Sequence, residues 1–141
     1  MNDTQMTRQV LERYHEELWV KKNISALPDL IHKDFADDSR KDFSAPGPEY
    51  ARGFFQSLFG AFPDLKSETK TLIAEGDKAA IMWELTGTYN GENLWGMPVT
   101  GKSFAVRGID IIEVKDGKII RDYGGMVDQF PKILQQLGLQ Q

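Results

Sequence analysis

The first half of the chain carries its apolar residues at helical spacing. Between residues 4 and 22 they recur every three or four positions with charges between them, which predicts an amphipathic helix. A short helix is expected over 25–32 with Ser25 as its N-cap, followed by a brief strand over 35–39. A third helix is expected to begin at Pro48, because proline is favoured at the first helical position.

The spacing changes to that of strands in the second half, where apolar and polar residues alternate. Turn pairs that contain glycine divide this half into short segments, which is typical of antiparallel hairpins. Helices first, then hairpins, then a final helix is an α+β order in one domain spanning residues 1–141. The expected elements are a hairpin over 70–89 that turns at 76–77, a loop over 90–101, a hairpin over 102–125 that turns at 116–117 and a helix over about 129–137.

The Asp-Gly turn at 116–117 decides which side chains of the second hairpin share a face. A two-residue type I′ turn would pair Lys115 with Lys118, whereas a three-residue loop with a bulge would pair Val114 with Lys118. We favour the three-residue loop because it gathers three apolar side chains on one surface. On that register the residues that share a face are Asp110, Ile112, Val114, Ile120, Asp122 and Gly124.

Asp110 and Asp122 are therefore the candidate catalytic residues. Side chains directly opposite each other on neighbouring strands stand about 5 Å apart at Cβ. Two carboxyl groups that close in an apolar surround raise the pKa of one of them, as a general acid–base pair requires. The alternative is that one or both lie at a rim, solvated or paired with Arg107 or Arg121.

Composition excludes several other kinds of chemistry. The chain has 141 residues, a net charge of −4 without a basic cluster, and no cysteine, so nucleic-acid binding, disulfides and thiolate metal sites are not expected. His15 and His32 fall on predicted helices, away from the strands, and no second histidine completes a zinc-protease motif. Neither a signal sequence nor a membrane-spanning stretch is predicted, so we expect a cytoplasmic protein without membrane or metal partners.

Several segments together resemble the SnoaL-like polyketide cyclases, a family within the nuclear-transport-factor-2-like superfamily. The resemblance runs from about Thr7 to Leu139. Its most specific part is the order G-x-P-x-T-G-K, then G-I-D-I, then D-G-K-I. The segments that carry it are AFPDL, MWELTGTYNG, WGMPVTGKSFAVRGIDIIEVKDGKIIRDY and ILQQLGL.

The resemblance implies both a fold and an activity. The fold is a cone of cystatin or nuclear-transport-factor-2 type, in which a curved antiparallel sheet wraps on N-terminal helices around an apolar pocket. Members of known activity close a ring by intramolecular aldol condensation of a polyketide ester, without metal or cofactor. Their acid–base aspartate follows an aromatic residue on the strand after D-G-K-I, and a histidine on the preceding strand assists it.

This sequence departs from that pattern at both acid–base positions. The aromatic residue corresponds to Tyr123, the aspartate's position to Gly124 and the histidine's position to Asp110. Asp122 could act from the same face, whereas Asp128 could do so only if the chain folded back. Gly124 therefore indicates that the family's chemistry is lost, unless Asp110 and Asp122 replace it.

A mostly apolar pocket is expected between the first and third helices and the sheet. Tyr14 either points its ring into this pocket or packs in the core with its hydroxyl bonded, and core packing is the alternative for Phe55 and Phe104. Trp95 and Met97, in a loop bounded by glycines, are expected to form a lid. The predicted substrate-binding residues are Tyr14, Phe55, Trp83, Trp95, Met97 and Phe104.

The other face of the second hairpin is also apolar, with Ile109, Ile111, Ile119 and Tyr123. A sheet that is apolar on both sides needs a second cover. The sequence therefore predicts a homodimer formed through the sheet, as the resemblance also implies.

Functions from different classes stay open on the sequence alone. The first is a cofactor-free enzyme that performs acid–base chemistry of aldol type on a small hydrophobic carbonyl compound, which the pair Asp110 and Asp122 favours. The second is a non-catalytic protein that binds a small hydrophobic molecule, which the glycines at 124–125 favour. Isomerase, dehydratase or epoxide hydrolase activity is a further alternative, since one fold hosts many reactions.

Overall fold

The computed structural model describes residues 2–37 and 47–139. Its helical elements are α1 (Asp3–Tyr14), the π-helix η1 (His15–Val20), the 3₁₀ turn η2 (Ile24–Ala26), α2 (Leu27–Leu30), α3 (Gly47–Ala61) and α4 (Gly125–Gln136). Its strands are β1 (Ile31–Asp37), β2 (Lys66–Glu75), β3 (Lys78–Thr88), β4 (Ser103–Lys115) and β5 (Lys118–Asp122).

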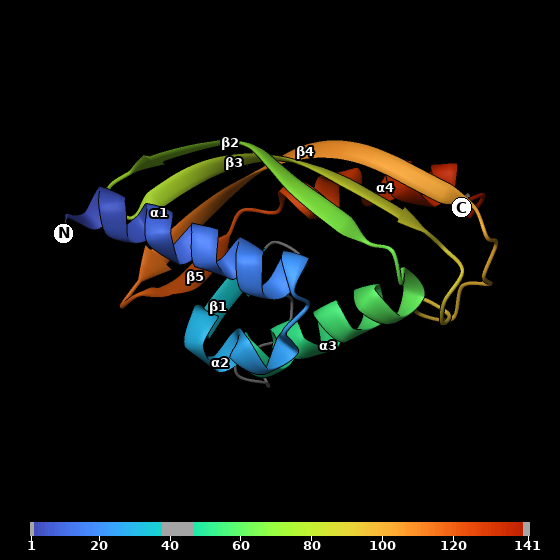
Figure 1. Ribbon diagram of the computed structural model, residues 1–141, viewed down its shortest axis with the longest axis horizontal. Helices are drawn as coiled ribbons and strands as arrows, with labels where there is room; N and C mark the ends of the chain where they lie inside the picture. Colours follow the sequence, from blue (N-terminus) through green and yellow to red (C-terminus); the bar gives the residue numbers. More distant parts are fainter. Residues whose placement is uncertain (1, 38–46, 140–141) are drawn as a thin grey trace.

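The strands form one sheet in the order β1-β5-β4-β3-β2, in which β1 and β5 are parallel and the other neighbours antiparallel. Figure 1 shows the long strands β2, β3 and β4 arching over α1 and α3, which lie on the concave side. The predicted α+β class, with a curved sheet wrapped on N-terminal helices, is confirmed.

The first helix begins where the sequence provides a capping box. The Gln5 N–H donates to the Asn2 side chain, and the Asn2 N–H donates to the Gln5 side chain. The predicted helix over 4–22 is confirmed as a continuous helical segment, but its last part is wound as the π-helix η1. Single π-helical turns within α-helices are frequent at functional sites.

The region after η1 differs from the prediction. The expected helix over 25–32 is reduced to η2 and α2, and Ser25 lies inside η2 instead of capping a helix. Ile31 already belongs to β1, because it pairs with Ile119 of β5. The strand predicted over 35–39 therefore begins earlier, and residues 38–39 lie outside the described part of the chain. Tertiary pairing here overrides local propensity.

The hairpin of β2 and β3 turns at 76–77 as predicted. Along β3 the residues alternate between the concave core and the outer face, as expected for a strand covered on one side. The core-facing residues of β3 are Ala79, Ile81, Trp83 and Leu85. This alternation points Trp83 toward α1 and gives the sheet its concave apolar surface.

The turn of the second hairpin corrects the predicted register. Lys115 pairs with Lys118, and Asp116 and Gly117 have φ of 55° and 75°, as in the two-residue type I′ turn. The predicted three-residue loop is therefore wrong; the type I′ turn matches the right-handed twist of the strands. A bulge follows within the ladder, and as a result Ile119, at 2% exposure, is buried in place of Ile120. Because of the bulge, Asp122 faces the concave side as expected, although the turn differs from the predicted one.

Helix α4 begins four residues before its predicted start and lies beside β4 (Figure 1). β5 pairs with β4 only as far as Ile112, so the rest of that edge of β4 needs other partners. The Tyr123 N–H donates to the Ile111 carbonyl at 2.9 Å, and the Gln136 side-chain amide bonds both backbone groups of Ala105, at 2.7 and 3.1 Å. α4 and its side chains thus cover an edge that would otherwise be open.

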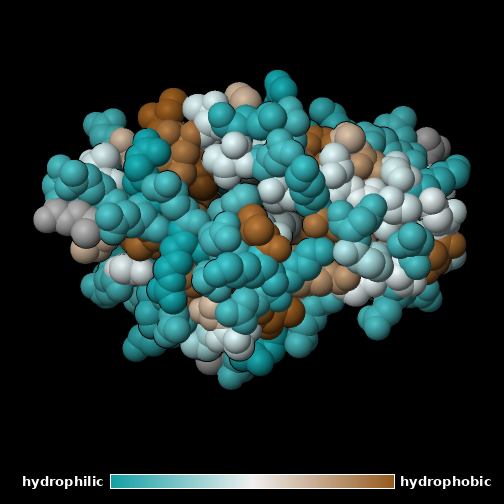
Figure 2. All heavy atoms as spheres, in the orientation of Figure 1, coloured by the Kyte–Doolittle hydropathy of each residue, from teal (hydrophilic) through white to brown (hydrophobic). Residues whose placement is uncertain are grey.

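The face seen in Figure 2 is mainly hydrophilic, and its apolar side chains gather in small separate patches. This agrees with an amphipathic α1 that turns its polar side outward. Among the described residues, no helix is long and apolar enough to cross a membrane.

Candidate functional site

A cavity of about 90 Å³ lies between α1, η1, α3 and the concave face of the sheet. Its wall is mostly apolar, and its polar groups come from α1, from η1 and from four strands. The apolar lining residues are Leu11, Trp19, Phe54, Ile81, Leu85, Ile112 and Met126. The residues with polar side chains are Tyr14, His15, Ser67, Thr69, Trp83, Asp110 and Asp122. Such a concave apolar site with a few convergent polar groups is typical of small-molecule binding.

Asp110 lies on β4 at the inner end of this cavity. The indole N–H of Trp83 donates to its Oδ2 at 3.0 Å. Oδ1 is out of contact with solvent and makes no direct hydrogen bond with a described residue, although the N–H groups of Gly125 and Met126 point toward the carboxyl group from the first turn of α4. The carboxyl group is therefore held in place mainly by Trp83 and by its neighbour on β5.

Burial raises the pKa of Asp110 above its ordinary value. The Trp83 indole, Asp122 and the nearby N–H groups of Gly125 and Met126 lower the pKa of Asp110, but desolvation is the larger effect. Asp110 therefore holds a proton more readily than an exposed aspartate, which suits a group that donates a hydrogen bond to a substrate.

Asp122 is the second carboxyl group of the site. Its strand partner is Ile112, and its Oδ1 accepts a hydrogen bond from the Gly124 N–H at 2.9 Å. It is close enough to Asp110 for the two carboxyl groups to share a hydrogen bond. The structure thus brings together the two predicted catalytic residues, although they stand diagonally and not directly opposite each other.

The alternative pairing of Asp110 with an arginine at the rim is not what the structure shows. Arg107 points to the outer face of the sheet, where it bonds Glu84 at 2.7 Å. The guanidinium of Arg121 lies over the ring of Tyr123, 4.6 Å from its centre. Asp110, in contrast, is part of the cavity wall.

The glycines at 124 and 125 have structural reasons of their own. Gly124 has φ of +91°, a backbone conformation that an aspartate adopts only with strain. A Cβ on Gly125 would stand 1.9 Å from the Ile109 carbonyl oxygen and 2.4 Å from Oδ1 of Asp110. Glycine at both positions lets α4 begin against β4, with its first N–H groups directed at Asp110.

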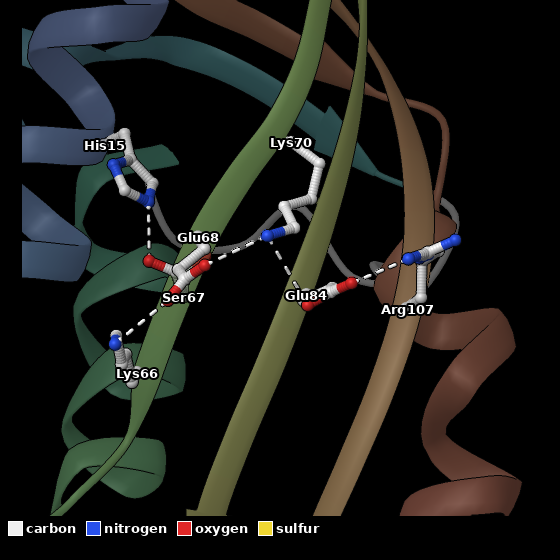
Figure 3. Close-up of polar contacts among 7 residues, drawn as sticks. All are labelled: His15, Lys66, Ser67, Glu68, Lys70, Glu84 and Arg107. Atoms are coloured by element: carbon white, nitrogen blue, oxygen red, sulfur yellow. Dashed lines mark hydrogen bonds and ion pairs between the residues drawn. The ribbon is translucent and has the colours of Figure 1, made fainter.

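His15 reaches the cavity although both histidines had been predicted to lie away from the strands. Its Nε2 lies 3.0 Å from the Ser67 carbonyl oxygen on β2, and Figure 3 shows the ring extending from the end of α1 toward that strand. The signal in the sequence was its position directly after Tyr14, at the edge of the apolar stripe. His32 lies on β1 and not on a helix, beside Asp34 and Asp116.

The other predicted substrate-binding residues are only partly in this cavity. Tyr14 and Trp83 line it, whereas Phe55 lines an adjoining cavity of about 50 Å³ that shares Tyr14, Phe54, Ile112 and Asp122 with the first. Phe104 packs against Phe62 in the core. The binding of substrate by these residues stays a prediction.

Trp95 and Met97, which were expected to form a lid, do not line the cavity. Trp95 is 57% exposed and packs on Phe130 of α4. Met97 is half-buried, and its carbonyl accepts a hydrogen bond from the Tyr89 hydroxyl. The loop packs around Tyr89, whose hydroxyl also accepts a hydrogen bond from the Leu94 N–H. None of these loop residues lines the cavity.

Within residues 2–37 and 47–139, no three His, Asp or Glu side chains lie close enough together to hold a metal ion.

Comparison with known proteins relates the chain to a protein family. The sequence pattern of the SnoaL-like polyketide cyclases matches residues 9–137. No curated protein matches the chain by sequence.

Solved structures share the fold over most of their length. TsrD from Streptomyces laurentii superposes with a TM-score of 0.77 over 99% of both chains, at 23% identity. IdmH from Streptomyces antibioticus, proposed to be a polyketide cyclase, superposes with a TM-score of 0.71 over 94% of this chain and 98% of its own, at 23% identity. A protein from Kribbella flavida proposed to be a ketosteroid isomerase gives 0.63 over 87% and 78%, at 21% identity. At sequence identities this low, the structural likeness shows a common fold and nothing further.

Proposed function

Because the chain belongs to the SnoaL-like polyketide cyclase family, we propose that it is an enzyme that performs acid–base chemistry of aldol type on a small apolar carbonyl compound. The observation that carries the proposal is the pair Asp110 and Asp122 at the inner end of an apolar cavity, with the pKa of Asp110 raised by burial. Perturbed carboxyl groups in a cleft are typical of catalytic sites.

The two carboxyl groups have different surroundings and therefore different parts in the reaction. Asp122, in its ionised form, removes a proton from the carbon next to the substrate carbonyl. Asp110, in its protonated form, donates a hydrogen bond to the carbonyl oxygen and stabilises the enolate. The enolate carbon then attacks a second carbonyl group of the same molecule, a C–C bond forms, and the proton on Asp122 passes to the new alkoxide. Both aspartates end in the state in which they began.

The apolar wall supports this chemistry in two ways. It excludes water, which strengthens the hydrogen bond from Asp110 to a developing negative charge. Trp83 fixes the orientation of Asp110 through Oδ2, and Oδ1 is buried against Gly125, so the proposed hydrogen bond to the substrate comes from Oδ2. An isomerisation by proton removal and return would use the same pair, and ring closure differs from it only in the second carbonyl group.

A binding protein without catalysis is the second candidate. It is favoured by Gly124, which stands where the family's acid–base aspartate is expected and whose backbone conformation disfavours an aspartate. The cavity would then hold a small apolar molecule, with Asp110 and Trp83 as polar anchors.

Enolisation of a probe ketone distinguishes these functions without knowledge of the natural substrate. The probe is 2-acetylnaphthalene, whose methyl protons exchange with deuterium oxide when a base forms the enolate, as followed by proton NMR. We expect exchange with the wild-type protein, and a loss of about 10²–10⁴-fold in Asp110→Asn and in Asp122→Asn, the usual worth of a positioned acid or base.

Asp128→Asn is the matched control, because Asp128 is exposed in the first turn of α4 and does not line the cavity. It should exchange the probe at the wild-type rate. Full exchange in both Asp110→Asn and Asp122→Asn would rule out the pair. Tight binding of the probe with no exchange in the wild type would establish the binding protein instead.

A further inference from the structure

The polar groups of the cavity lie in two separate places. Asp110, Asp122 and the Trp83 indole come from the middle of the sheet. His15, Ser67 and Thr69 come from η1 and from β2, the edge strand; we call these three residues the mouth group. Thr69 is exposed, so the mouth group lies where the cavity opens to solvent.

The strand register directs the mouth group into the cavity. Ser67 pairs with Leu85 and Thr69 pairs with Trp83, and both partners are buried on the concave face. Side chains paired across neighbouring strands point to the same side of the sheet, so both hydroxyl groups point toward the helices. Neither hydroxyl makes a hydrogen bond with a described residue, which leaves both available to a ligand.

The hydrogen-bond partner of His15 determines which ring nitrogen carries the proton. The Ser67 carbonyl oxygen can only accept, so Nε2 carries the proton that it receives (Figure 3). In the neutral ring, Nδ1 is then a proton acceptor. The mouth group therefore offers one acceptor nitrogen and two hydroxyl groups, each of which can donate and accept.

The spacing of the strands fixes the distance between the two polar places. β2 and β4 are separated by β3, and neighbouring strands lie about 4.8 Å apart. Through Leu85 and Trp83, Ser67 and Thr69 stand opposite Val106 and Gly108 of β4. Asp110 lies further along β4 at about 3.3 Å per residue, so the two places are roughly 12–16 Å apart at Cα. Between them the wall is formed by Ile81, Trp83 and Leu85, which offer no polar group other than the indole N–H already bonded to Asp110.

We propose that the mouth group is a binding subsite for a hydroxyl group on the end of the substrate opposite its reacting carbonyl. The inference rests on the proposed function, since it takes Asp110 and Asp122 as the place of the carbonyl. The substrate is then a flat, elongated apolar compound with a carbonyl at one end and a hydroxyl at the other. A hydroxyl in this position can bond to the Ser67 hydroxyl, which points into the cavity beside the imidazole of His15.

A matched pair of ligands tests the subsite by binding alone. The probes are 2-acetylnaphthalene and 6-acetyl-2-naphthol, which differ by one hydroxyl on the ring far from the carbonyl. Binding is measured by isothermal titration calorimetry. We expect the wild-type protein to bind the hydroxylated ketone about 3- to 10-fold more tightly, as one buried hydrogen bond permits.

Ser67→Ala should remove most of this preference, and His15→Phe should reduce it. In each variant the readout is the ratio of the two affinities, because a general change of the cavity wall affects both ketones alike. Ser67→Ala keeps the bond from His15, which goes to the Ser67 backbone carbonyl, so it tests the subsite without loosening η1. Ser57→Ala is the matched control on α3, where the Ser57 hydroxyl bonds the Gly53 carbonyl and lines neither cavity. It should keep the full preference.

The outcomes separate the two proposals. Equal affinities of the wild type for both ketones, or a preference that survives in Ser67→Ala and His15→Phe, would overturn the subsite and leave the proposed function standing. Binding of neither ketone by a folded wild-type protein would overturn both the proposed function and the subsite. A preference that is also lost in Ser57→Ala would show a general effect of the substitution and would likewise contradict the subsite.

Discussion

At Gly125 the backbone of α4 passes so close to β4 that a single methyl group would collide with the Ile109 carbonyl. The nearest atom belongs to the Ile109 backbone, so rotating a side chain cannot relieve the collision. Gly125→Ala should therefore destabilise the fold by about 1–3 kcal/mol, the usual cost of overpacking. Chemical denaturation measures this directly.

Gly53 provides the matched control for that substitution. It lies inside α3, and a Cβ there would have no heavy atom within 4 Å. Gly53→Ala should stabilise the protein by about 0.5–1 kcal/mol, because alanine loses less backbone freedom in a helix. Equal and small effects at the two glycines would contradict the close approach of α4 to β4.

The raised pKa of Asp110 predicts how the stability of the fold changes with pH. A carboxyl group whose pKa is higher in the folded state binds its proton more tightly there, so it destabilises the fold as it ionises. Its favourable contribution is complete below the unfolded pKa of about 3.9 and is lost as the pH rises through the folded pKa. Asp110→Asn cannot ionise, so its stability relative to wild type should increase over that rise in pH.

Urea denaturation of the wild type and Asp110→Asn at a series of pH values measures this difference. Asp128→Asn, with an exposed carboxyl group, should show no such trend. A difference between wild type and Asp110→Asn that is the same at low and neutral pH would mean that Asp110 is not perturbed by folding.

Sequence reasoning reached the two aspartates but not His15, and the reason is physical. Alternation along a strand has a period of two, so it assigns side chains to a face without knowledge of the partner. The start of a π-helix has no comparable pattern, and it changes where the following side chains point. The structural reason for Gly125 could not be predicted either, because a close approach between distant segments leaves no local signal.

At the scale of elements, α4 closes the edge of β4 with one side chain. Gln136 takes the place of a neighbouring strand by bonding both the N–H and the carbonyl of Ala105. Gln136→Ala should speed the amide exchange of Ala105, by about fivefold for each 1 kcal/mol of hydrogen bonding lost. Gln135→Ala, on the next and exposed residue, is the control and should leave that amide protected.

The hairpins show how far elements follow from sequence. Their positions and their turns at 76–77 and 116–117 were predictable, because turn pairs and alternation are local. The bulge that places Ile119 and not Ile120 in the core was not, since it reconciles a type I′ turn with a concave face set by the rest of the sheet. The short α2 and the early start of β1 likewise depend on pairing with β5.

At the scale of the whole molecule, the outer face of the sheet combines an apolar area with a row of charges. The apolar side chains there are Ile109, Ile111 and Tyr123, at 54%, 46% and 39% exposure, while Ile119, once expected among them, is buried. The charged row, drawn in Figure 3, links Glu68, Lys70, Glu84 and Arg107 from β2 to β4. Such an area is suited to a second copy of the chain, since the row carries both signs of charge and a twofold axis can set each sign against its opposite.

We propose on this ground that the protein forms a homodimer through this face of the sheet. A charged side chain placed at the centre of the face tests this prediction. Ile109→Lys would bury an unpaired ammonium group, so it should weaken association by roughly 30-fold, the effect of a 2 kcal/mol hot spot. Light scattering at micromolar concentration should give twice 16.0 kDa for the wild type and a shift toward 16.0 kDa for the variant. Val20→Lys is the control, because Val20 is equally exposed, at 53%, but lies on η1. A wild-type protein that stays at 16.0 kDa would show that this apolar face is not covered by a second copy.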